Sequence, residues 1–190
     1  MRSALDTIVL VPGLRGHVTD HWQTRLEAAR PNAVSVPGLG SSYPNLDDRI
    51  ALLNRVIEDV HGPVTIVAHS AGVLTTVHWA ARHTAAVSGA LLVTPPDLAA
   101  PLPEPYPALA ELRDNGWLPI PTAPLPFPSI VAASTNDPLG DHERLRGLAQ
   151  AWGSRFHSLG AVGHLNPASG YGEWPTASTL LDELAATLVG

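Results

Sequence analysis

The stretch VTIVAHSAG, residues 64–72, is a short β-branched run that stops at a serine between small residues. This pattern predicts a strand that turns sharply into a helix, with the serine strained at the turn. The backbones then approach so closely that only small residues fit two positions before and after it, here Ala68 and Gly72. Glycine is usual at both positions, and Ala68 is one methyl group larger. The stretch indicates a nucleophile elbow at Ser70, or else a serine that only caps a helix from Ala71 to about His83.

The composition indicates one globular domain. Of the 190 residues, 45% are hydrophobic and 15% are charged, which is typical of a folded chain rather than a disordered one. A chain of this length buries about 70% of its unfolded surface, which is enough for a core without disulfides. No apolar run approaches the roughly 20 residues that span a bilayer. We therefore expect a single domain over residues 1–190.

The charge and the lack of cysteine narrow the function classes. A net charge of −6 disfavours nucleic acid or an anionic membrane as the main partner. The absence of cysteine excludes disulfides, thiolate catalysis and thiolate metal sites. The first residues also lack the apolar stretch of a signal peptide. We therefore expect a cytoplasmic protein.

Strands and helices are predicted to alternate along the chain. Six short, mostly apolar runs are typical of a sheet buried on both faces: Thr7–Val11, Ala33–Val36, Val64–Ala68, Ala90–Thr94, Ser129–Ala133 and Arg155–Leu159. Helical patterns occur at Asp20–Ala29, Leu46–His61 (with Asn45 as N-cap), Ala71 to about His83, Glu143–Trp152 and Thr176–Val189. The alternation predicts an α/β fold, with a six-stranded, mostly parallel sheet and helices on both faces.

Prolines crowd the segment 95–128 between the fourth and fifth predicted strands. Their density excludes a long helix, and only a short one, Pro107–Asn115, fits the pattern. The segment is either a rigid surface connection or a small lid or wall of a pocket at the carboxyl ends of the strands.

Reactive side chains follow three of the predicted strands. Ligands of open α/β sheets bind beyond the carboxyl ends of the strands. Ser70 follows the third strand, Asp137 the fifth and His164 the sixth. The order Ser, Asp, His is the order of the triad in an α/β-hydrolase. This joint agreement predicts a catalytic triad of Ser70, Asp137 and His164.

Alternatives exist for two members of this triad. Asp97 also follows a strand, but its neighbours indicate a proline turn, so we favour Asp137 as the acid. His164 lies in a glycine-flanked loop after the last strand. His69 precedes Ser70, and we expect its side chain to point away. Two further histidines, His17 and His21, follow the first strand and are candidates to line the pocket.

The loop after the first strand, residues 11–16, supplies a candidate oxyanion hole. Such a hole needs two backbone N–H donors, and we expect them from Leu14 in this loop and from Ala71 at the start of a helix. The loop lacks the glycine spacing and the lysine of a phosphate-binding loop, so a nucleotide site is disfavoured.

Motifs along nearly the whole chain carry a family resemblance: Pro12-Gly13-Leu14 with Asp20-His21-Trp22, His69-Ser70-Ala71-Gly72, Pro95-Pro96-Asp97, Ser134-Thr135-Asn136-Asp137-Pro138, and Gly163-His164-Leu165-Asn166 with Ser169-Gly170 and Trp174. Together they resemble the retinoblastoma-binding protein 9 / YdeN-like serine hydrolases. The resemblance implies a compact α/β-hydrolase without the first two strands of larger members, and ester or amide hydrolysis by Ser70, Asp137 and His164. Ala68 and the loop segment Arg15-Gly16-His17 depart from the family pattern.

The sequence therefore predicts a serine hydrolase that cleaves small carboxylic esters, or amides, through an acyl-enzyme, without metal or organic cofactor. Trp22, Trp117 and Trp174 are candidate pocket residues for a small acyl or aromatic group, although tryptophans are mostly core residues. Two alternatives stay open. One is a hydrolase-fold protein-interaction module with little activity. The other is a haloperoxidase or acyl transferase that uses the same triad.

Overall fold

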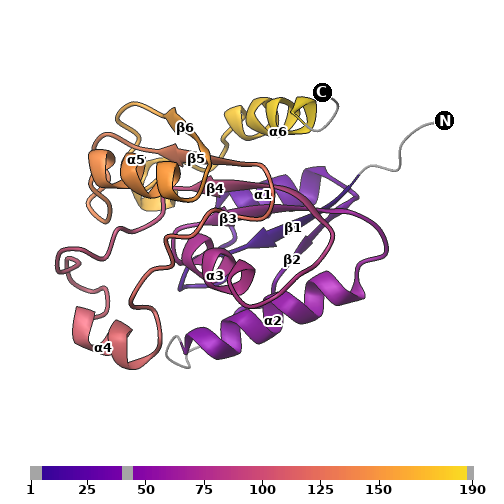
Figure 1. Ribbon diagram of the computed structural model, residues 1–190. Coiled ribbons are helices and arrows are strands. Elements are labelled where there is room, and N and C mark those ends of the chain that lie inside the picture. Colours follow the sequence, from indigo (N-terminus) through magenta and orange to yellow (C-terminus); the bar gives the residue numbers. More distant parts are fainter. Residues whose placement is uncertain (1–5, 40–44, 188–190) are drawn as a thin grey trace.

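The computed structural model describes residues 6–39 and 45–187 (Figure 1). Its strands are β1 (Thr7–Val11), β2 (Ala33–Ser35), β3 (Val64–His69), β4 (Val87–Val93), β5 (Ser129–Ala133) and β6 (Arg155–Ser158). Its α-helices are α1 (Trp22–Ala29), α2 (Leu46–Asp59), α3 (Ala71–Ala80), α4 (Leu109–Asp114), α5 (His142–Ala151) and α6 (Thr176–Ala186), and a short 3₁₀ turn, η1, covers Pro167–Ser169. The predicted α/β class is confirmed.

The six strands form one sheet in the order β2-β1-β3-β4-β5-β6. Every neighbouring pair is parallel, so the sheet is wholly rather than mostly parallel over the described residues. All carboxyl ends of the strands therefore meet at one edge. The loops after β1, β3, β5 and β6 are brought together there. Ligands of open parallel sheets bind at this edge, so we expect the functional site in these loops.

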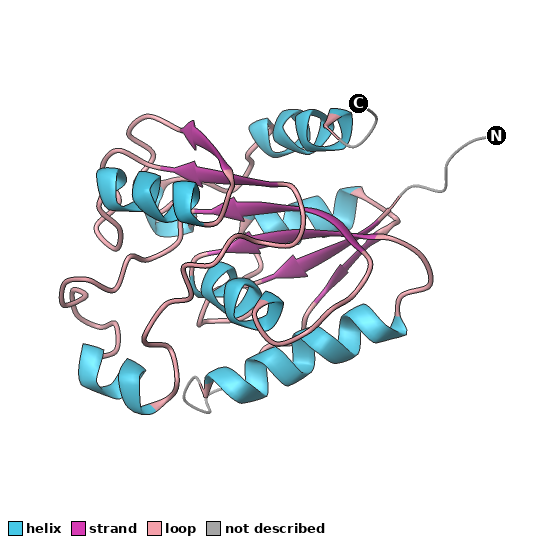
Figure 2. Cartoon of the chain, viewed as in Figure 1, coloured by secondary structure: helices cyan, strands magenta, loops and turns pink. Residues whose placement is uncertain are grey.

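Helices cover both faces of the sheet (Figure 2). Alternate residues of a strand point to opposite faces, so Val9, Ile66 and Leu92 pack with α2, α3 and α5. Leu10 and Leu91 pack on the opposite face with α1 and α6. The two buried clusters explain why the strands read as continuously apolar in the sequence.

The predicted helix bounds differ from the observed ones at the ends. Helix α2 begins where predicted, because the side chain of Asn45 accepts a hydrogen bond from the backbone N–H of Asp48 at 3.2 Å. It ends at Asp59 rather than His61, and the other helix ends shift by similar amounts. The predicted end of the last helix at Val189 lies outside the described residues.

The proline-rich segment 95–128 contains α4 as its regular element and otherwise runs as turns and extended chain. It is packed against the domain, since Leu98, Leu112 and Trp117 are buried in the same cluster as α2 and α3. Figure 1 shows the segment looping out beyond α3 and returning to β5.

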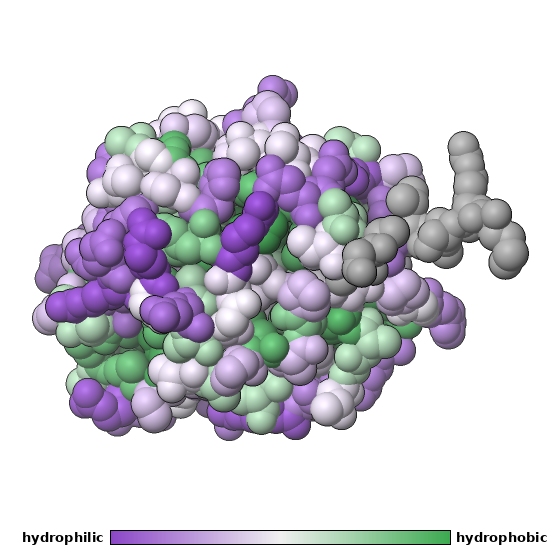
Figure 3. All heavy atoms as spheres, turned by 45° about the horizontal axis from the view of Figure 1, so that its top comes forward, coloured by the Kyte–Doolittle hydropathy of each residue, from purple (hydrophilic) through white to green (hydrophobic). Residues whose placement is uncertain are grey.

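The face of the molecule in Figure 3 has hydrophobic residues in separate small patches among hydrophilic ones. None of the helices within residues 6–39 and 45–187 is long and apolar enough to cross a membrane.

Candidate active site

Ser70 occupies a sharp turn between β3 and α3. Its backbone has φ 56° and ψ −125°, a strained conformation for a residue with a side chain. Its side chain makes no capping hydrogen bond to α3, so the helix-cap interpretation does not describe it. A Cβ on Gly72 would lie 2.1 Å from the carbonyl oxygen of Val11, which explains the glycine. Ala68 is tolerated two positions before Ser70 and is fully buried.

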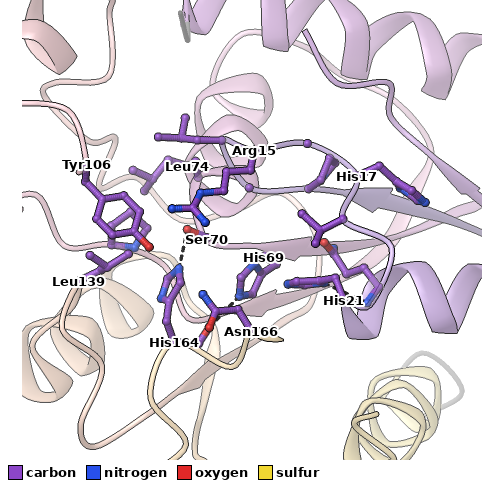
Figure 4. Close-up of a pocket in the computed structure, with 18 of the residues that line it drawn as sticks. Arg15, His17, His21, His69, Ser70, Leu74, Tyr106, Leu139, His164 and Asn166 are labelled. Carbon is purple, nitrogen blue, oxygen red and sulfur yellow. Dashed lines mark hydrogen bonds between the residues drawn. The ribbon is translucent and has the colours of Figure 1, made fainter. Parts of the chain in front are cut away.

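A continuous hydrogen-bonded chain links Asp137, His164 and Ser70. His164 Nδ1 lies 2.8 Å and 3.0 Å from the two carboxylate oxygens of Asp137. His164 Nε2 lies 2.8 Å from Ser70 Oγ (Figure 4). A carboxylate only accepts, so Nδ1 carries the proton and Nε2 is left to accept from the serine hydroxyl. The Asp137 side chain is fully buried, which shields this pair from water.

The rival acid, Asp97, has other partners. Its carboxylate accepts hydrogen bonds from the backbone N–H groups of Ala99 and Asp141, both at 2.8 Å. It also lies 4.0 Å from Arg144. Asp97 therefore ties the start of the proline-rich segment to the loop before α5, and it is not hydrogen bonded to His164.

Two side chains of the β5 loop hold the loop that carries His164. Ser134 Oγ accepts from the backbone N–H of Val162 at 3.2 Å. Asn136 Oδ1 accepts from the backbone N–H of Gly163 at 2.7 Å and from the Ser134 hydroxyl at 2.9 Å. The loops after β5 and β6 are thereby fixed to each other, which sets the position of His164 relative to Asp137.

His69 does not point away from the site, contrary to the prediction. Its Nε2 lies 2.9 Å from the backbone carbonyl oxygen of His164, so this nitrogen carries the proton and donates. The centroids of these two rings are 5.0 Å apart, and the His21 ring packs edge-on against His69 at 4.5 Å. His69 nevertheless follows the alternation along β3, since it lies on the face of Val67 and its ring is 5.9 Å from that of Trp22, which belongs to the same cluster as Val67.

His21 and His69 are both uncharged at neutral pH. Burial lowers the pKa of His21 to about 4, with smaller contributions from the charges of His164 and His17. Burial likewise lowers the pKa of His69 well below its usual value. His21 accepts the backbone N–H of Gln23 at 3.2 Å through Nδ1, which requires that nitrogen to be unprotonated.

The loop after β1 is held by a buried arginine that sequence reasoning missed. Arg49 of α2 donates through Nη2 to the carbonyl oxygens of Pro12 at 2.7 Å and Gly13 at 3.2 Å. Its Nε donates to Thr75 Oγ1 at 3.2 Å. Burial lowers the pKa of Arg49 to about 10, so it stays protonated at neutral pH. The sequence gives no signal for this role, because Arg49 reads as one polar position of an amphipathic helix.

Both expected oxyanion donors border the cavity beside Ser70. Ala71 is the first residue of α3, so its backbone N–H has no acceptor inside the helix. Leu14 follows Gly13, whose Cβ position is 3.4 Å from the Ser70 Cβ. Leu14 and Ala71 therefore both border the cavity that contains Ser70, and Ala71 lies at the positive end of α3.

A cavity of about 150 Å³ opens over Ser70. The proline-rich segment forms one wall with Leu98, Leu102, Tyr106 and Trp117, and the β1 loop forms another. This is the pocket-wall alternative for the segment rather than a plain surface connection.

The three candidate tryptophans separate in the structure. Trp117 lines the cavity. Trp22 and Trp174 do not line it; their ring centroids lie 4.8 Å apart, and they pack with α1 and α6 on the other face of the sheet. Their expected place in the pocket was wrong because large apolar surfaces near the site are drawn into the core. Of the two candidate histidines, both His17 and His21 line the cavity.

No group of three or more histidine, aspartate or glutamate side chains in the described part of the chain is arranged to hold a metal ion.

The comparisons with known proteins agree with this architecture. A YdeN-like hydrolase of Pectobacterium atrosepticum is 30% identical to this chain, with a TM-score of 0.82 over 96% of this chain and 91% of that one. The ydeN gene product of B. subtilis is 21% identical, with a TM-score of 0.75 over 95% and 99%. Est1E of Butyrivibrio proteoclasticus is 11% identical, with a TM-score of 0.69 over 95% and 88%, and shares the fold.

No curated protein matches the chain. Residues 8–183, however, match the family model described as serine hydrolase. Since this match covers most of the chain and agrees with the hydrolase structure that is 30% identical, the chain belongs to the serine hydrolase family.

Proposed function

We propose that this serine hydrolase cleaves small carboxylic esters through an acyl-enzyme on Ser70. The observation that carries the proposal is the hydrogen-bonded chain from Asp137 through His164 to Ser70, with separations of 2.8 Å at both steps. A serine hydroxyl is a weak nucleophile until a neighbouring base takes its proton. The strained elbow presents that hydroxyl at the floor of the cavity, where a carbonyl group has access to it.

The reaction follows from these placements. Ser70 Oγ attacks the carbonyl carbon while its proton moves to His164 Nε2, and Asp137 stabilises the resulting imidazolium. The carbonyl oxygen becomes an oxyanion between the backbone N–H groups of Leu14 and Ala71. The C–O bond then breaks, and His164 gives its proton to the departing alcohol. Water repeats the sequence on the acyl-enzyme, which releases the acid and restores Ser70.

The size of the cavity and the composition of the chain bear on the size of the substrate and on the compartment in which the reaction takes place. A cavity of about 150 Å³ matches a group of about the size of a benzene ring, which favours short acyl or small aromatic groups. A chain without cysteine needs no oxidising compartment to form disulfides, which fits the cytoplasm that we propose as the setting. The mechanism uses protein groups alone, and the partner it requires is a small acyl substrate. The resemblance of the motifs to retinoblastoma-binding protein 9 stays a prediction from the sequence.

Labelling with a fluorophosphonate probe tests the proposal. The probe phosphonylates an activated serine, so we expect one label on Ser70 and none in Ser70→Ala. The control is Ser88→Ala, because Ser88 lies at the amino end of β4, away from the cavity. Ser70→Ala is expected to lower kcat on 4-nitrophenyl butanoate by about 10⁴ or more. A wild-type protein that neither labels nor hydrolyses esters would instead favour the protein-interaction module.

A further inference from the structure

The cavity over Ser70 has two chemically different sides. In Figure 4, Tyr106, Leu139 and Leu74 lie to one side of Ser70, and His17 and His21 lie to the other. The Tyr106 side is walled by apolar residues of the proline-rich segment. The histidine side is built by the β1 loop, a stretch that departs from the family pattern in the sequence. A substrate whose scissile carbonyl sits at Ser70 therefore meets an apolar environment at one end and a polar one at the other.

Arg15 extends from the β1 loop over the cavity toward Ser70 (Figure 4). Within residues 6–39 and 45–187, its guanidinium makes no ion pair with a carboxylate. Some other exposed arginines have acidic partners, such as Arg25, Arg82 and Arg155. Among the described residues, Arg55 and Arg113 also lack one, so what distinguishes Arg15 is its position over the cavity. An arginine with free donors at the mouth of a cavity is a ready site for a planar anion.

The cavity lining contributes no opposing charge. Among the described residues that border it, none is an aspartate or glutamate, and Arg15 is the one side chain that is charged at every physiological pH. The nearby His21 stays neutral because burial lowers its pKa to about 4. In a protein with a net charge of −6, this leaves a local cationic position beside the nucleophile.

A second donor borders the same cavity. Asn166 uses its Oδ1 to accept the backbone N–H of Ser169 at 3.0 Å and the Ser169 hydroxyl at 2.9 Å. These bonds fix the orientation of the amide, so its Nδ2 group is the donor left for a ligand. Asn166 and Arg15 both border the cavity and come from different loops, with Asn166 beside the rings of His164 and His69 in Figure 4.

We propose that the substrate is an ester that carries a carboxylate, with Arg15 and Asn166 binding that carboxylate and the Tyr106 side holding the apolar part. This inference rests on the proposed esterase function and names its substrate class. Arginine donates two parallel hydrogen bonds to a carboxylate, which gives orientation as well as affinity. The carboxylate only binds and takes no part in the reaction, so the acyl transfer at Ser70 is unchanged.

Two matched pairs of esters test the inference, since the carboxylate can belong to the acid or the alcohol part. Mono-4-nitrophenyl adipate is compared with 4-nitrophenyl hexanoate, and 3-(butanoyloxy)benzoate with 3-methylphenyl butanoate. The readout is the ratio of kcat/KM for the charged ester to that for its neutral partner. We expect a ratio on the order of 10 in at least one pair at low ionic strength, falling as salt is added.

Three variants assign the preference to Arg15. Arg15→Gln is expected to bring the ratio to about 1 or below, and Arg15→Lys to keep part of it. Arg55→Gln removes the same charge from an exposed position on α2 and is expected to keep the wild-type ratio. Ratios at or below 1 in both wild-type pairs, or a preference that survives in Arg15→Gln, overturn the inference. If even the neutral esters are turned over no faster than by Ser70→Ala, the proposed function itself has failed.

Discussion

The buried guanidinium of Arg49 donates a hydrogen bond to the carbonyl oxygen of Pro12 at 2.7 Å. With the bond to Gly13, it turns two carbonyl groups of the β1 loop toward α2. The next residue, Leu14, carries one of the two proposed oxyanion donors. The position of that donor therefore depends on a residue of another element, far away in the sequence.

We expect Arg49→Met to lower kcat more than it raises KM. Methionine keeps much of the apolar stem but leaves the carbonyl groups of Pro12 and Gly13 without their donor. The oxyanion donor of Leu14 then loses its fixed position, which is expected to lower kcat on 4-nitrophenyl butanoate by about 10-fold to 100-fold. Urea unfolding should show a loss of about 2 kcal/mol in the free energy of unfolding, because a buried charged donor is removed.

The matched control is Arg55→Met on the exposed face of the same helix, for which both kcat and stability should stay close to wild type. A stability loss in Arg49→Met without any loss of kcat in the folded protein would contradict the link between Arg49 and the oxyanion donor.

The acid is tested by comparing Asp137→Asn with Asp97→Asn. An amide at position 137 no longer holds the His164 tautomer that leaves Nε2 free to accept from Ser70, so we expect kcat to fall by about 10²- to 10⁴-fold. Asp97 ties loops together through two backbone N–H groups and lies near Arg144, but it is not hydrogen bonded to His164, so its asparagine variant should lose less than about 10-fold in kcat. Both are measured on one ester, and the opposite ranking would assign the acid to Asp97.

The pKa of His21, lowered to about 4, makes stability depend on pH in a defined window. The unfolded chain binds a proton at this histidine near pH 6.5, whereas the folded protein resists it until about pH 4. Folded stability is therefore lost as the pH falls through this window, by up to about 3 kcal/mol, and the loss levels off below it. In His21→Asn, the asparagine side-chain oxygen can still accept the hydrogen bond from the Gln23 N–H, but it does not bind a proton between pH 7 and pH 4.

Urea unfolding of wild type and His21→Asn at pH 7, 5.5 and 4 checks this. We expect the free energy of unfolding of the wild type to fall relative to that of the variant as the pH is lowered, since the shared titrations of other groups cancel in the difference. A difference that stays constant from pH 7 to pH 4 would show that His21 is not kept neutral by the fold.

The sequence was sufficient for the succession of strands and helices along the chain and for the loops in which Ser70, Asp137 and His164 lie. Apolar runs mark buried parallel strands, and the carboxyl ends of such strands always share one edge, so residues after them are brought together by topology alone. The carboxylate that contacts His164 was also predictable, because the turn chemistry around Asp97 differs from that around Asp137.

The residues that position the site were not predictable in the same way. Arg49 and His69 donate hydrogen bonds to backbone carbonyl groups of distant loops. Every residue has such a carbonyl group, so the sequence does not indicate which one accepts the bond. Trp22 and Trp174 were pocket candidates because their segments could reach the site, whereas in the structure their rings pack against each other in the cluster that contains α1 and α6. Such contacts depend on how elements pack, which local patterns do not encode.

The proposed substrate size gives the last prediction. The wall of the cavity comes from a segment dense in proline, whose ring fixes φ and restricts the backbone motion that a large opening lid requires. We therefore expect kcat/KM for 4-nitrophenyl esters to be highest between acetate and about hexanoate and to fall steadily toward palmitate. Activity should show no jump when the ester concentration passes the point at which micelles form. Highest activity on palmitate, or activation by micelles, would mean that the segment moves aside and uncovers a much larger cavity.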